Sequence, residues 1–278
     1  MDLSIQALIM GLVQGLTEFI PVSSSGHLIL VPWAMGWKDP FIDSLAFSVM
    51  LHMGTLLALI LYFWRDWVTL IPAGLASIRD RSIGDDPDRK TAWLLVVATI
   101  PAVLVGPLLT DTIESWVRDP APVALMLCVG AAILWLADRW GSRVREMESM
   151  TFGGALVIGV AQVLALVPGI SRSGISIAAG LLEGLNREAA ARFSFLMATP
   201  VVAGAGAWEA LKLLKGEAGV HPQASLIVIG FVAAATSGIL AIHFMLAFLR
   251  KQPVTVFVVY RVLAAAAVFA ILLSPHGA

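Results

Sequence analysis

Long apolar stretches separated by short polar segments make up most of the chain. Because a membrane-spanning helix needs about 20 mostly apolar residues, the pattern predicts six spanning helices joined by polar loops. Their expected limits are Ser44 to Trp64, Thr91 to Leu109, Pro122 to Ala137, Phe193 to Leu211, Ser225 to Leu249 and Val254 to Leu273. The pattern is typical of an all-α integral membrane protein, and we expect a single membrane domain over residues 1–278.

Two further apolar stretches are interrupted by Pro, Ser and Gly. Residues 3–35 contain the break Pro21 to His27, and residues 152–182 contain the break Pro168 to Gly174. Each break leaves two pieces that are too short to cross a membrane separately, so we expect two re-entrant helical hairpins. Non-helical backbone at membrane depth needs protein or water around it. The two breaks should therefore line a polar cavity.

Composition supports the membrane class and excludes several others. Charged residues make up only 13% of the 278 residues and hydrophobic residues 59%, whereas a soluble domain carries about 25% charged residues. The formal net charge of -1 argues against nucleic acid or any other uniformly charged partner. Cys128 is the single cysteine, which excludes an internal disulfide and a thiolate metal cluster.

The basic residues predict the orientation. With both hairpins re-entrant, twelve Lys and Arg fall in loops on one side of the membrane, and Lys38, Arg118, Lys212 and Lys215 fall on the other. The positive-inside rule makes the first side cytoplasmic and places both termini outside. The two hairpins then enter from opposite sides, so residues 1–137 and 150–273 are expected to form inverted repeats.

An internal alignment supports the repeat. A shift of 148 residues superposes identical residues at and near the breaks: Gly11 and Gly159, Gln14 and Gln162, Ser23 and Ser171, Ser25 and Ser173, Gly26 and Gly174. Inverted repeats with broken helices place the working site near the membrane midplane. In the same alignment Ser24 is the counterpart of Arg172, so these two residues are expected to face one anion near the pseudo-twofold axis.

The few polar residues at the breaks are the candidates for chemistry. Gln14 and Glu18 share a helix face, and a charged residue at membrane depth is a functional candidate by default. The alternatives are an interfacial or structurally paired carboxylate for Glu18 and an interhelical hydrogen bond for Gln14. The guanidinium of Arg172 has the planar fork that binds phosphate oxygens. Its alternative is an internal salt bridge to Glu18.

Ser23, Ser24 and Ser25 begin the helix after the first break, where free N–H groups and the helix dipole favour an anion; plain capping is the alternative. His27 could donate to an anion, shuttle protons or only satisfy a neighbour. Together these groups fit phosphoryl transfer, with serine or water as the nucleophile and Mg²⁺ or Ca²⁺ as the cation. Arg261, seven positions into the last span, could snorkel or pair inside.

The segments Gln14 to His27 and Pro168 to Gly174 resemble the two signature segments of the bacterial undecaprenyl-diphosphate phosphatase family, the bacitracin-resistance proteins. Gly184 to Phe195 is also similar, and the resemblance covers nearly the whole chain. It implies hydrolysis of undecaprenyl diphosphate to the monophosphate, which recycles the lipid carrier for peptidoglycan synthesis. It also implies a divalent cation, a place in the bacterial cytoplasmic (inner) membrane, and an active site open to the periplasmic side.

The same match implies roles for single residues: Ser24 as the nucleophile, His27 as a general acid/base or phosphate-orienting group, Arg172 as the diphosphate clamp, and Glu18 as metal ligand or base. The family permits Glu or Gln at the first motif position, so Gln14 becomes an accessory. The further substrate-binding residues are Ser23, Ser25, Ser171, Ser173 and Gly174.

A transporter or flippase for a polyprenyl phosphate or another anion is the alternative function, because inverted repeats with broken helices are also a transporter device. A hydroxyl, an imidazole and a carboxylate beside Arg172 favour the enzyme. The expected partners are a polyprenyl diphosphate lipid and the membrane, and the sequence leaves a homodimer open.

Overall fold

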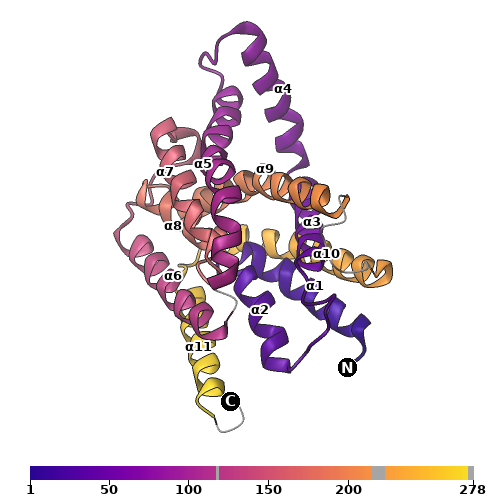
Figure 1. The fold of residues 1–278 in the computed structure, drawn as a ribbon. Helices are drawn as coiled ribbons and strands as arrows, with labels where there is room; N and C mark the ends of the chain where they lie inside the picture. The colour runs from indigo at the N-terminus through magenta and orange to yellow at the C-terminus, as the bar shows by residue number, and fades with distance from the viewer. Residues whose placement is uncertain (117–118, 215–222, 275–278) are drawn as a thin grey trace.

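The computed structural model describes residues 1–116, 119–214 and 223–274. These residues form helices and no β-strand (Figure 1). The helices are α1 (Leu3–Phe19), α2 (Ser24–Met35), α3 (Leu45–Tyr62), α4 (Trp64–Asp80), α5 (Pro87–Trp116), α6 (Pro120–Trp140), α7 (Phe152–Val163), α8 (Arg172–Leu182), α9 (Arg187–Leu214), α10 (Ala224–Leu249) and α11 (Thr255–Leu272). Two short 3₁₀ helices are also present: η1 (Met147–Ser149) lies between α6 and α7, and η2 (Leu164–Leu166) lies between α7 and α8.

All six predicted spans are helices. Five of them, α5, α6, α9, α10 and α11, are each long and apolar enough to cross a membrane alone. The sixth, α3, passes the same test together with α4, from which it is bent by 81°. The all-helical membrane fold predicted from the sequence is thereby confirmed.

Helix α4 lies where the sequence pattern predicted only a loop. Arg65, Asp66, Arg79 and Asp80 at its two ends lower its hydropathy below that of a span. Its apolar residues nevertheless recur at the helical spacing of three to four, which makes it an amphipathic helix. This short-range periodicity, rather than mean hydropathy, was the signal for α4.

The two hairpins, α1–α2 and α7–α8, have the same local geometry at their breaks. Ser23 and Ser171 both have φ of 78° and cap the following helices by accepting hydrogen bonds from Gly26 N and Gly174 N, at 3.3 and 3.1 Å. A non-glycine residue in this region costs roughly 1–3 kcal/mol, so its occurrence at two positions related by the 148-residue shift supports the internal repeat.

The packing interlocks the two halves of the chain. Helix α1 of the first half packs along α10 of the second half, and α7 of the second half packs along α5 of the first half. Gly15 lies so close to α10 that an added Cβ would be 2.4 Å from Ala234 O. Small residues of α10, including Gly230, Ala234 and Gly238, therefore form the surface that receives α1. The repeat limits 1–137 and 150–273 stay a prediction.

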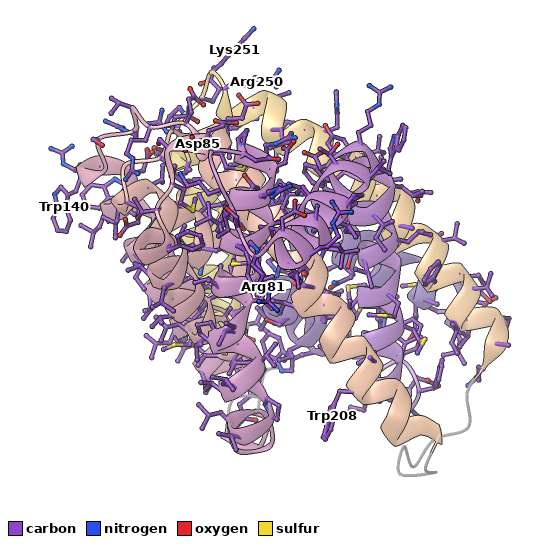
Figure 2. The ribbon with its side chains drawn as sticks, turned by 90° about the horizontal axis from the view of Figure 1, so that it is seen from above. Arg81, Asp85, Trp140, Trp208, Arg250 and Lys251 are labelled. Atoms are coloured by element: carbon purple, nitrogen blue, oxygen red, sulfur yellow. The ribbon has the colours of Figure 1, made fainter. Side chains whose placement is uncertain are left out.

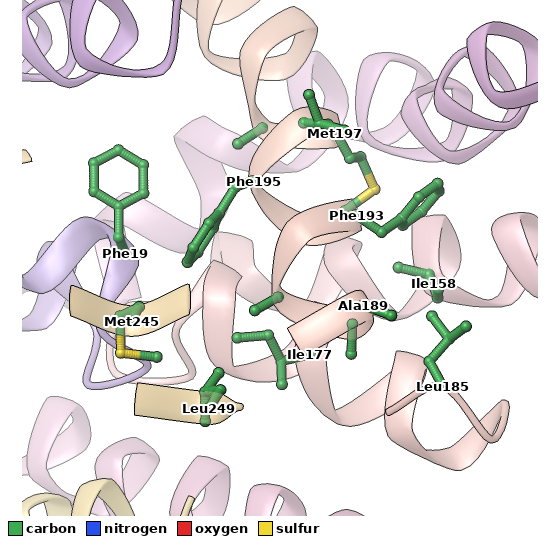
Figure 3. Packing of buried hydrophobic residues seen from close by; sticks show 14 of the residues in the cluster. Phe19, Ile158, Ile177, Leu185, Ala189, Phe193, Phe195, Met197, Met245 and Leu249 are labelled. Atoms are coloured by element: carbon green, nitrogen blue, oxygen red, sulfur yellow. The ribbon is translucent and has the colours of Figure 1, made fainter. Parts of the chain in front are cut away.

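An apolar core surrounds the hairpins and fixes the ends of their helices. Phe19 of α1 packs edge-on against Phe195 of α9, with ring centroids 5.4 Å apart. Ile158, Ile177 and Met245 add side chains from α7, α8 and α10 (Figure 3). Because buried side chains in such a core have little freedom, the backbone next to each break is held rigidly.

Charged residues of the loop between α10 and α11 lie at one end of the molecule (Figure 2). Arg250 and Lys251 lie toward one end, and Trp208 of α9 lies toward the opposite end (Figure 2). Arg250 donates to Glu188 at the start of α9, at 2.8 Å. This arrangement agrees with the predicted basic side, which stays a prediction as an orientation in the membrane. Arg118 and Lys215, which were counted for the other side, lie outside the described residues.

Candidate functional site

The two breaks contact each other in the middle of the molecule. Ser23 Oγ accepts a hydrogen bond from Gly169 N at 3.0 Å, and Ser173 Oγ donates to Ile20 O at 3.3 Å. Gly169 has φ of +101°, and an added Cβ would lie 2.6 Å from Met126 Cβ. Only glycine therefore fits without strain at this position. We call the contact between the two breaks the crossing.

Arg261 of α11 fastens the crossing. Its guanidinium is fully buried and donates to the carbonyls of Pro21 (3.3 Å), Gly169 (2.6 Å) and Ile170 (2.9 Å), which belong to both breaks. It also donates to Leu127 O of α6 at 3.0 Å. No carboxylate pairs with it within the part of the chain that the structure describes. The role that the sequence left open is thus structural: a buried cation satisfied by backbone carbonyls.

Arg261→Met is expected to lower the free energy of unfolding by about 3–5 kcal/mol, because it leaves several buried carbonyls without donors. The measurement is the thermal midpoint in detergent. Arg250→Met is the matched control: its exposed pair with Glu188 contributes about 0–1 kcal/mol. Equal midpoints for the two variants would contradict the structural role of Arg261.

A cluster of polar side chains forms around Glu18 next to this crossing. Glu18 is only 5% exposed. One carboxylate oxygen, Oε1, accepts from Arg172 Nη2 at 2.9 Å, and the other, Oε2, accepts from Ser24 Oγ at 2.5 Å and from Gln14 Nε2 at 3.0 Å. Ser24 and Arg172 are the first residues of α2 and α8. The structure therefore brings together four predicted site residues from three helices, and we call them the Glu18 cluster.

The cluster has the geometry of an activated nucleophile. A serine hydroxyl that donates to a buried carboxylate can lose its proton to that carboxylate as it attacks. Arg172 neutralises Glu18, which lowers the cost of burying either charge, and its second terminal nitrogen makes only a 3.5 Å contact to Ser194 O. The predicted salt bridge to Glu18 is present, and Arg172 keeps N–H groups for an anion.

A cavity of about 260 Å³ opens beside the cluster and is lined by Glu18, Ser24 and Arg172. His52 of α3 also lines it, with Nε2 3.8 Å from Glu18 Oε2. His52 Nδ1 donates to Ser48 O at 2.8 Å, so the ring is held in place with Nε2 toward Glu18. His52 was not among the site residues predicted from the sequence. A histidine inside an otherwise apolar span was the available signal.

Other predicted site residues have different surroundings. His27 donates from Nδ1 to Ser23 O at 2.7 Å, and its Nε2 lies 2.7 Å from Tyr260 OH of α11. Both ring nitrogens are thus used away from the Glu18 cluster, and a catalytic role for His27 stays a prediction. Ser25 does line the cavity, and its Oγ is 3.4 Å from Ser23 Oγ.

Three predicted site residues of the second break are buried and make contacts within the protein: Ser171, Ser173 and Gly174. Ser171 caps α8, its Oγ lies 3.2 Å from Ser173 Oγ, and an added Cβ on Gly174 would be 3.1 Å from Arg261 Nη1. Their contacts hold the crossing of the breaks. Direct binding of substrate by these three residues, as by Ser23, stays a prediction.

The oxygen atoms of the cluster suit a hard divalent cation only in part. No group of three or more His, Cys, Asp or Glu side chains gathers among the described residues. Glu18 supplies a carboxylate, and Gln14 Oε1 is buried without a hydrogen-bond partner. Mg²⁺ commonly takes one or two protein carboxylates and completes its shell with water and substrate phosphates. The residues fit a cation shared with a phosphate ligand rather than a complete protein cage.

Comparison with known proteins identifies the family. Residues 7–267 match the model of the family described as bacitracin resistance protein BacA. Curated relatives named undecaprenyl-diphosphatase include those of Desulforudis audaxviator, 45% identical over 93% of this chain and 94% of the relative, and Moorella thermoacetica, 43% identical over 96% and 97%. The relative from Thermomicrobium roseum is 45% identical over 92% of this chain and 94% of its own length. The chain therefore belongs to the BacA family of bacitracin resistance proteins.

Proposed function

We propose that this protein hydrolyses undecaprenyl diphosphate to undecaprenyl phosphate and inorganic phosphate, the activity named in its relatives. The observation that carries the proposal is the 2.5 Å hydrogen bond from Ser24 Oγ to Glu18, whose other oxygen accepts from Arg172. A nucleophile, a base and a cation thus meet in one cavity. Nothing in the site favours the transporter alternative.

In the first step, Ser24 Oγ attacks the terminal phosphorus while its proton passes to Glu18 Oε2. The new Oγ–P bond forms as the bridging P–O bond breaks, and the electron pair leaves with the lipid monophosphate. Arg172 stabilises the charge that builds on the non-bridging oxygens. Because Ser24 and Arg172 begin α2 and α8, both helix dipoles place their positive ends near that charge.

In the second step, water hydrolyses the phosphoserine. Once Glu18 has given its proton to the departing lipid phosphate, the carboxylate can take a proton from the attacking water. Glu18 then returns this proton to Ser24 Oγ as the serine–phosphate bond breaks and inorganic phosphate leaves. The hydrogen bond from the Ser24 hydroxyl to the Glu18 carboxylate supports a covalent route over direct attack by water. A divalent cation held by Glu18 and Gln14 Oε1 would supply further charge neutralisation for the diphosphate.

Access to the site is proposed from the periplasmic side. A second cavity of about 490 Å³ shares Ser25 and Ser48 with the site cavity. It extends to Asp43 and Asp119, which the charge count places outside the cytoplasm. Its walls are mainly apolar side chains of α2 and α3, including Trp33 and Phe47. This outer cavity could admit a headgroup from the periplasmic leaflet while the prenyl tail stays against apolar surface.

Purified protein in detergent is expected to release phosphate from a prenyl diphosphate when Mg²⁺ or Ca²⁺ is present. A chelator should stop the release, and readdition of the cation should restore it, because the site holds one carboxylate and needs further positive charge. Phosphate assay over time is the measurement. Absence of release by wild-type protein with either cation would contradict the enzyme function, whereas release in chelator would contradict only the cation.

A further inference from the structure

A buried glutamine outside the predicted site lines the same cavity. Gln162 lies in the last turn of α7 and is 3% exposed. It borders the cavity together with Glu18, Ser24 and Arg172. Neither its amide nitrogen nor its amide oxygen has a hydrogen-bond partner within the described residues. Leaving both ends of a buried amide unpaired is costly, so partners from a ligand or its water are expected.

The internal repeat explains why Gln162 has no partner in the protein. Its counterpart under the 148-residue shift is Gln14, whose Nε2 donates to Glu18 one helical turn further on. The same shift places Leu166, which also lines the cavity, where Glu18 would stand. The second half thus keeps the glutamine and lacks the carboxylate. Gln162 is free to bind a group that enters the cavity.

We propose that Gln162 is a substrate-binding residue that contacts the diphosphate of the lipid, a role that rests on the proposed function. Its Nε2 donates to a non-bridging phosphate oxygen from the wall formed by α7. Its Oε1 accepts from a water molecule that accompanies the headgroup, since phosphate oxygens offer no donor when ionised. Gln162 and Arg172 then hold the headgroup from two elements, and Ser24 remains available for attack.

The test compares Gln162→Leu with the wild-type full chain in detergent. Loss of a hydrogen bond to a charged phosphate should raise KM about tenfold or more. The thermal midpoint without ligand should be unchanged or higher, because leucine does not bury an unpaired amide. Gln6→Leu is the matched control: Gln6 is a buried glutamine of α1 with an unpaired Oε1 that does not line the cavity, and its KM should equal that of wild type.

A second measurement separates this inference from the enzymatic function. Methylenediphosphonate, which cannot be hydrolysed at its bridge, should raise the thermal midpoint of wild-type protein with Mg²⁺ and raise that of Gln162→Leu much less. A wild-type KM and a wild-type midpoint shift in Gln162→Leu would overturn the role of Gln162 and leave the proposed function intact. If wild-type protein releases no phosphate, the proposed function fails, and the methylenediphosphonate shift still decides the role of Gln162.

Discussion

Replacing Arg172 with alanine is expected to lower kcat/KM by about 10³-fold or more, the range found when an arginine that stabilises a phosphoryl-transfer transition state is removed. Arg172 begins α8 and reaches Glu18 at 2.9 Å, so it lies beside the proposed base and lines the cavity that would receive the phosphate. Arg172→Lys should also be strongly impaired, because a lysine cannot give two parallel donors to a phosphate. Steady-state phosphate release measures both variants.

Loss of Arg172 also leaves Glu18 buried without its cation, so misfolding must be distinguished from lost chemistry. The double variant Arg172→Ala/Glu18→Gln removes both charges and should recover stability without recovering turnover. Thermal midpoints in detergent give this comparison. If Arg172→Ala is folded and retains more than about a tenth of wild-type kcat/KM, a transition-state role of the size expected for such an arginine is contradicted.

Glu18→Gln is expected to reduce kcat by about 10²- to 10⁴-fold, the usual contribution of a general base. An amide can still occupy the space near Ser24 and Gln14, but it cannot take the serine proton. Glu188→Gln, at a partly exposed residue paired with Arg250, is the control and should keep full activity.

The same reaction should pass through a phosphoserine. Rapid quenching of wild-type protein with substrate labelled in the terminal phosphate is expected to leave label on Ser24, and Ser24→Ala should show none. Label on another serine would assign the nucleophile to that residue instead of Ser24. Full turnover without any bound label would favour direct attack by water, with Glu18 as its base.

The sequence predicted the breaks and the meeting of Glu18, Ser24 and Arg172 for physical reasons that act locally. Proline, glycine and serine interrupt an apolar helix wherever they cluster, and a charge at membrane depth is too costly to occur without a partner or function. The internal repeat also relates Ser24 to Arg172 from the sequence alone. Their common contact, Glu18, follows from both being at helix starts beside the crossing of the breaks.

Other parts of the site depend on contacts that side-chain patterns do not encode. Arg261 is satisfied by backbone carbonyls, which are present at every position and give no sequence signal. The direction of His27 toward Tyr260 depends on how α11 packs against α2. Gln162 was visible in the sequence as the counterpart of Gln14 in the repeat. That its amide has no hydrogen-bond partner among the described residues becomes apparent only in the packed structure.

The crossing of the two breaks has a consequence for how the chain folds during its synthesis. Pro21 and Ser23 emerge from the ribosome early, yet they bond to Arg261 and Gly169, which are synthesised much later. Until α11 is in place, the carbonyl of Pro21 lacks the donor that it has in the folded protein, and lipid offers no hydrogen bond instead. The last helix is the element that completes the crossing. A chain that ends before α11 is therefore expected to be misfolded and inactive, not partly active.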